Sequence, residues 1–133
     1  MKETIILMML EFQTQVKLQH WNTYGYSTHK ALGELYDDLV DQIDEFVETM
    51  IGKDGVRPSF PDTFQLELKK PETINDTEAL TSFVDFLISL SDILDPRKDS
   101  DLLNDRDTML GTVNQIDRKS TRLNSSHIPL SRM

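Results

Sequence analysis

The sequence contains no cysteine, and its opening residues hold no long apolar run. Without cysteine there is no disulfide framework and no thiolate ligand for a metal, which suits a cytoplasmic protein. The start of the chain, MKETIILMMLEF, has one lysine and a short apolar run that Glu11 interrupts. It resembles neither a secretion signal nor a membrane span, so we expect a helix there and no contact with a membrane.

Basic residues are scarce in residues 1–116, which hold 10 Lys and Arg against 22 Asp and Glu, a net charge of −12. Such a surface repels phosphate backbones and attracts cations. No lysine-rich arm compensates at the N-terminus. We therefore expect one acidic domain that does not bind nucleic acid.

A long amphipathic helix is the main feature of the sequence. Apolar periodicity predicts it from a cap at Ser27 or Thr28 to a stop at Gly52. Its apolar stripe consists of Leu32, Leu35, Leu39, Ile43, Phe46 and Met50. At about 1.5 Å per residue the helix is about 36 Å long, which is unusual in a small domain.

Three further helices are predicted around it. The first covers residues 2–20, and its apolar positions recur at helical spacing. The next starts at Asn75, with Glu78 three residues on as a capping box, and ends at Pro96. The last begins near residue 100, and its apolar pattern stops at Ile116.

The segment between the two central helices breaks the helical pattern. Residues 52–74, GKDGVRPSFPDTFQLELKKPETI, contain two glycines and three prolines. A connection of this length is too long for a tight antiparallel turn and suits the crossover of ferritin-like bundles. The predicted fold class is therefore all-α: a ferritin-like four-helix bundle with a long crossover and a truncated fourth helix.

Two histidines and two carboxylates are the candidates for chemistry. His20 and His29 are nine residues apart, and Asp44 and Glu48 lie one turn apart on the long helix, where a cation would be a natural partner. Simpler interpretations remain open. His20 could pack beside the tryptophan at a helix end, His29 could face water, and a helix with seven acidic residues over 34–48 contains such carboxylate pairs by chance.

These residues resemble the signature of Dps proteins, the ferritin-like mini-ferritins of bacteria. That signature has His-Trp-Asn at the end of the first helix, a His early in the second, and then an Asp and a Glu one turn apart. The chain has His20-Trp21-Asn22, then His29, Asp44 and Glu48. The short interval between the histidines and the run KALGELYD are closer to a Dps-like family of unknown function encoded by tailed phages.

The resemblance implies that His20, His29, Asp44 and Glu48 bind iron, and that Fe(II) is oxidised there by peroxide or dioxygen. Along one helix His29 lies about 22 Å from Asp44 and about 28 Å from Glu48, whereas ligands lie about 2 Å from a metal. These residues therefore cannot share a site within one chain. Two copies of the helix crossing antiparallel would complete it, in a homodimer or larger homo-oligomer.

An alternative function keeps the fold and loses the chemistry. In it, the chain is a helical structural or interaction protein of a phage, without ferroxidase activity. Gly33 favours this alternative, because many Dps proteins carry a further acidic ligand at that position. The intact pair of Asp44 and Glu48 favours iron binding.

The last seventeen residues differ from the rest. Residues 117–133, DRKSTRLNSSHIPLSRM, have four basic residues against one acidic and no apolar periodicity. They resemble the translation of a common sequencing-adapter oligonucleotide. We therefore expect a Dps-like domain over residues 1–116, followed by a non-native tail outside the packed core in which His127 has no function. A basic tail that binds nucleic acid is the alternative.

Overall fold

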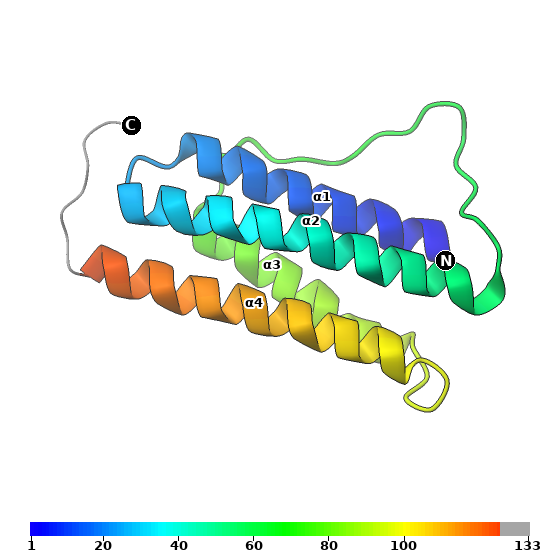
Figure 1. Cartoon of the computed structure of the whole chain (residues 1–133). Helices are drawn as coiled ribbons and strands as arrows, with labels where there is room; N and C mark the ends of the chain where they lie inside the picture. The colour runs from blue at the N-terminus through cyan, green and yellow to red at the C-terminus, as the bar shows by residue number, and fades with distance from the viewer. Residues whose placement is uncertain (126–133) are drawn as a thin grey trace.

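The computed structural model describes the backbone of residues 1–125 and the side chains of residues 1–116, and this part contains helices and no strand. Its elements are α1 (Lys2–Asn22), α2 (Tyr26–Asp54), α3 (Asp76–Ser89), a 3-10 turn η1 (Leu90–Asp92) and α4 (Ser100–Ser125) (Figure 1). The predicted all-α class and the four predicted helices are confirmed.

The four helices form a bundle in which α2 and α3 each pack against both α1 and α4. Figure 1 shows α1 and α4 running in one direction and α2 and α3 in the other. Neighbouring helices are therefore antiparallel. Because α2 and α3 point the same way, the chain between them returns along the length of the bundle before α3 begins.

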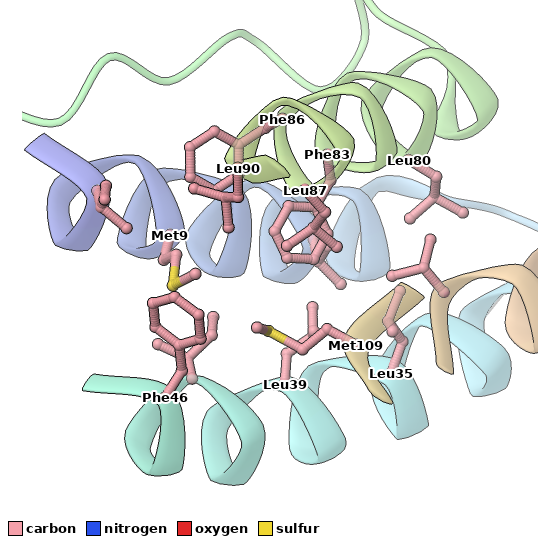
Figure 2. Close-up of a cluster of buried hydrophobic side chains, with 14 of the residues drawn as sticks. Met9, Leu35, Leu39, Phe46, Leu80, Phe83, Phe86, Leu87, Leu90 and Met109 are labelled. Atoms are coloured by element: carbon pink, nitrogen blue, oxygen red, sulfur yellow. The ribbon is translucent and has the colours of Figure 1, made fainter. Parts of the chain in front are cut away.

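The apolar stripe predicted for α2 forms the centre of the core. All six of its residues are buried, and Leu35, Leu39 and Phe46 have no exposed surface. Met9 of α1 and Met109 of α4 are buried in the same cluster, as are the α3 residues shown in Figure 2. Each helix thus contributes one apolar face to a single core.

The ends of α2 differ from the prediction. Gly25, rather than Ser27 or Thr28, is the N-cap, and its carbonyl accepts the first helical hydrogen bond from the His29 amide at 2.9 Å. Gly55, rather than Gly52, ends the helix. Its φ of 68° is left-handed, which glycine adopts without a steric cost. The prediction stopped at the first glycine, although a glycine with helical geometry lets a helix continue.

The start of α3 is as predicted, but its end is not. The Asn75 side chain accepts a hydrogen bond from the Glu78 amide at 2.7 Å, which confirms the cap. The α-helix stops at Ser89, before Pro96, and continues only as the short η1 turn. Arg106 of α4 donates to the Leu87 carbonyl at 2.9 Å and so satisfies one of the free carbonyls at this helix end.

The backbone of α4 continues beyond the predicted truncation at Ile116 and ends at Ser125. Residues 117–125 contain neither proline nor glycine, so nothing in them breaks a helix after the apolar pattern stops. Ile116 is buried and is the last residue whose side chain is described. The prediction that the tail stays outside the core concerns side chains from residue 117 onward and lies outside the described part.

Polar side chains of α1 form hydrogen bonds with the backbone of the crossover between α2 and α3. Glu11 accepts from the Glu67 amide at 2.7 Å, and Gln15 both accepts from the Lys69 amide and donates to its carbonyl. Gln19, only 1% exposed, donates to the Ile74 carbonyl at 3.2 Å and to Asp76 at 2.8 Å. Apolar periodicity does not reveal this polar face, because it indicates only the apolar stripe of α1.

We expect Gln19→Ala to destabilise the fold by about 2 kcal/mol. The substitution leaves the Ile74 carbonyl and the half-buried Asp76 carboxyl without their amide donor. Urea denaturation measures the change. Gln13→Ala is the control, because Gln13 lies on a different face of the same helix, and it should change stability by less than about 0.5 kcal/mol. Equal effects of the two substitutions would contradict the role of Gln19.

Candidate functional site

The end of α1 and the start of α2 bring the two predicted histidines into direct contact. The helices are antiparallel and joined by a turn of three residues, so His20 and His29 face each other. Their imidazole rings stack, with 3.9 Å between centroids and 18° between planes. The simpler interpretations, His20 packed beside the tryptophan and His29 facing water, do not describe this arrangement.

Reciprocal hydrogen bonds lock the histidine pair. Nδ1 of His20 lies 2.6 Å from the carbonyl oxygen of His29, and Nδ1 of His29 lies 2.8 Å from the carbonyl oxygen of His20. A carbonyl oxygen only accepts, so each Nδ1 must carry the proton and donate it. In the neutral state each ring therefore has an unprotonated Nε2 with a free lone pair.

Gly33 provides the space for this pair. A Cβ atom at position 33 would lie 2.8 Å from Cε1 of His20 and 3.2 Å from its Nδ1, closer than normal van der Waals contact. The His20 ring thus lies against the α2 backbone where any other residue would have a side chain. From the sequence, Gly33 was interpreted as a missing acidic ligand, whereas in the structure it has a steric role.

The surroundings of the pair favour neutral His20. Burial is the largest influence and lowers its pKa below the ordinary 6.5, and the nearby His29 and Lys17 lower it further. The hydrogen bond to the His29 carbonyl and the charge of Asp37 act in the opposite direction without reversing the shift. A neutral imidazole is the form that binds metals.

Asp44 and Glu48 do not join the histidines. Both are exposed on α2, further along the helix from His29. Within the part of the chain that the structure describes, no group of three or more His, Cys, Asp or Glu side chains is placed to hold a metal ion. The single chain thus holds the predicted ligands in two separate places, as the helical rise requires, and the shared site remains a prediction.

Trp21 lies beside the histidines in sequence but not in the core. It is 65% exposed, and the Lys17 ammonium lies 5.5 Å from its ring centroid. The same ammonium lies 4.5 Å from the ring centroid of Tyr36, so α1 and α2 are joined here by cation–π contacts. Tyr24 and Tyr26 are also exposed at this end of the bundle.

Asp105 of α4 lies in an acidic region between α2 and α4, apart from the histidine pair. Burial raises the pKa of Asp105, and the nearby carboxylates of Glu45 and Asp101 raise it further, while a hydrogen bond from Thr49 lowers it. The negative charge of the protein is therefore dense enough on this face to oppose ionisation of one carboxyl. The sequence analysis did not single out Asp105, because its partner Glu45 is on another helix.

No described helix has the length and apolarity that crossing a membrane requires.

A pocket of about 370 Å³ lies beneath the crossover and is lined by Phe12, Leu68 and Ala79, among others. None of the four predicted ligands contributes to its lining. This pocket is therefore separate from the candidate site.

Comparison with known proteins shows the family to which the chain belongs. The sequence model of a family of unknown function (DUF5856) matches residues 20–119, three quarters of the chain. The match begins at His20 and includes His29, Asp44 and Glu48. No curated protein and no solved structure matches the chain. The family description names no activity, so it leaves the resemblance to Dps proteins untested.

We expect His20 to make stability depend on pH. Because the folded-state pKa of His20 lies below 6.5, the unfolded chain binds more protons between the two pKa values. The stabilising contribution is complete above about pH 6.5 and is lost as pH falls through this interval. His20→Asn keeps an N–H donor near the Nδ1 position and does not titrate. The wild type should therefore lose more stability than this variant between about pH 7.5 and about pH 5.

Urea denaturation of both proteins at the two pH values measures this difference. All other titrating groups are common to the two proteins, so their contributions cancel in the comparison. Parallel loss of stability in the two proteins would show that the His20 environment does not shift its pKa.

Proposed function

Because the chain belongs to a family of unknown function (DUF5856), its activity has to be inferred from its own residues, and we propose that it binds and oxidises Fe(II) at sites shared between two copies. The proposal includes a ferritin-like fold related to that of Dps proteins. Two features support it: neighbouring helices alternate in direction, and one long crossover joins α2 and α3. Ferritin-like bundles have one such crossover.

The reciprocal hydrogen bonds between each Nδ1 and the other histidine's carbonyl are the observation that carries the proposal. Metal-binding histidines typically donate one ring N–H to a carbonyl or carboxylate, which orients the ring and leaves the other nitrogen for the metal. His20 and His29 both have this arrangement, with Nδ1 donating to a carbonyl and Nε2 unprotonated in the neutral ring. Two imidazoles are thus preorganised as ligands before a metal arrives.

A second chain supplies the remaining ligands in this proposal. Asp44 and Glu48 of one copy would join His20 and His29 of the other, and antiparallel pairing through α2 would create two equivalent sites. The mixture of nitrogen and carboxylate ligands suits Fe(II). A metal-binding lone pair lies in the plane of its ring, so two nearly parallel rings do not point at one ion. Each ring would bind its own ion.

The oxidation uses two Fe(II) ions for each molecule of hydrogen peroxide. Each Fe(II) gives up one electron, and hydrogen peroxide takes up two electrons and two protons to form two water molecules. Dioxygen is the alternative oxidant. The carboxylates of Asp44 and Glu48 would offset the added charge of Fe(III), and the acidic surface of α2 would attract further Fe(II).

The second candidate function is a helical structural or interaction protein, such as a phage protein of the same fold without ferroxidase activity. The reciprocal hydrogen bonds favour it in one respect, because the His20 carbonyl lies in the last turn of α1, where helical partners are lacking. His29 would then serve as a cap for α1. Fe(II) titration of the whole chain under anaerobic conditions separates the two functions.

Mixed dimers test the shared site directly. We expect His29→Asn and Asp44→Asn each to weaken Fe(II) binding when alone, because each substitution damages both sites of a dimer. When the two variants are combined, one site of each mixed dimer receives both lesions and the other receives neither. Anaerobic Fe(II) titration should therefore recover up to half of the sites in every mixed dimer.

The choice of substitutions protects the fold. Asn at position 29 retains a donor for the His20 carbonyl, and Asp38→Asn is a matched control that removes one charge from an exposed position of α2 outside the proposed site. This control should bind Fe(II) as the wild type does. If mixing recovers no sites although subunit exchange is confirmed, the shared site is wrong and the structural function is the better account.

A further inference from the structure

Gly33 occupies an unfavourable position for a glycine. It lies well inside α2, where glycine is less favourable than any residue except proline. Its backbone is helical, so no left-handed conformation requires a glycine there. The reason for a glycine must therefore come from what lies next to it.

The neighbour of Gly33 is the His20 imidazole. Three atoms of that ring lie within 3.5 Å of the position that a Cβ would occupy, and the closest, Cε1, would be at 2.8 Å. The ring is held in place by its stack with His29 and by its Nδ1 hydrogen bond to the His29 carbonyl. It could therefore yield to a side chain at position 33 only by giving up these contacts.

We propose that Gly33 is a positioning residue whose missing side chain lets His20 lie on α2 and holds both histidines in the state with protonated Nδ1 and unprotonated Nε2. The effect reaches His29 through the ring stack and the reciprocal hydrogen bonds. Its consequence for metal binding rests on the proposed function. The steric and tautomeric part is independent of that function.

Other glycines of the chain provide the contrast. Gly52 in α2 and Gly111 in α4 have helical backbone, and a Cβ at either would meet nothing within 4 Å. Alanine should be favourable at both. Gly111→Ala is therefore the matched control for Gly33→Ala, since both substitutions add one methyl group inside a helix.

A double-mutant cycle in melting temperature tests the steric part on the whole chain. Gly33→Ala should lower the melting temperature of the wild type but raise it by roughly 4 °C in a His20→Ala background, where the ring is absent and only helix propensity remains. Gly111→Ala should raise it in both backgrounds. A Gly33→Ala effect of the same sign and size in both backgrounds would overturn the proposal.

The tautomer provides a readout that a purely structural role would not change. With ¹⁵N-labelled histidine, NMR of the metal-free wild type should show protonated Nδ1 and unprotonated Nε2 for two of the three histidines, assigned with His20→Asn. Gly33→Ala should abolish this pattern at both positions, while Gly111→Ala should preserve it. Retention of both patterns in Gly33→Ala would also overturn the proposal.

Anaerobic Fe(II) titration then separates the two proposals. Loss of an organising partner typically weakens metal binding by about 10-fold to 100-fold, and this is the loss expected for Gly33→Ala. If the NMR pattern changes as expected but the wild type binds no Fe(II), the positioning role stands and the proposed function fails. If the wild type binds Fe(II) and Gly33→Ala binds it equally well with an altered NMR pattern, Gly33 does not position the metal ligands.

Discussion

The shared direction of α2 and α3 is the constraint on which the rest of the structure depends. Because both helices run the same way, the connection between them must travel back along the bundle without secondary structure of its own. Its backbone groups need hydrogen-bond partners, and Glu11, Gln15 and Gln19 of α1 supply them. The helix α1 is therefore both a core element and the support of the crossover, with an apolar face for one task and a polar face for the other.

The same topology determines where the histidines meet. With the long connection placed between α2 and α3, the connection between α1 and α2 can be short, and positions at similar distances from it lie opposite each other. His20 and His29 are such positions, and their separation of nine residues is what a three-residue turn between antiparallel helices allows. A longer interval would move the rings apart. The short interval between the two histidines thus has a structural meaning: it produces a stacked pair.

The features that the sequence predicted correctly depend on local or periodic signals. The stripe of α2 was readable because burial repeats with the helical period, and the cap at Asn75 because its partner is three residues away. The features it missed depend on partners distant in sequence. Gln19 is buried because a crossover more than fifty residues later lies over it, and the spacing of the histidines did not reveal that Gly33 leaves room for His20. The end of α2 was misjudged at Gly52 because a glycine can adopt either helical or left-handed geometry, and its own identity does not decide between them.

In the proposed function, the acidity of α2 would couple metal binding to the association of chains. Six acidic side chains are exposed on its middle part, residues 37–48: Asp37, Asp38, Asp41, Asp44, Glu45 and Glu48. Antiparallel pairing of two copies through this helix would bring two such sets together, and their repulsion opposes association. A divalent cation bound by Asp44 and Glu48 offsets part of that repulsion and adds a bond to His29 of the second copy. A metal ion that binds only to the paired copies stabilises the pair. By thermodynamic linkage, pairing then strengthens metal binding by the same factor by which the metal strengthens pairing. An interaction protein without metal would instead need a basic partner to cover this face. The two functions therefore differ in what packs on α2: a second acidic copy with bound cations in one case, and a basic partner in the other.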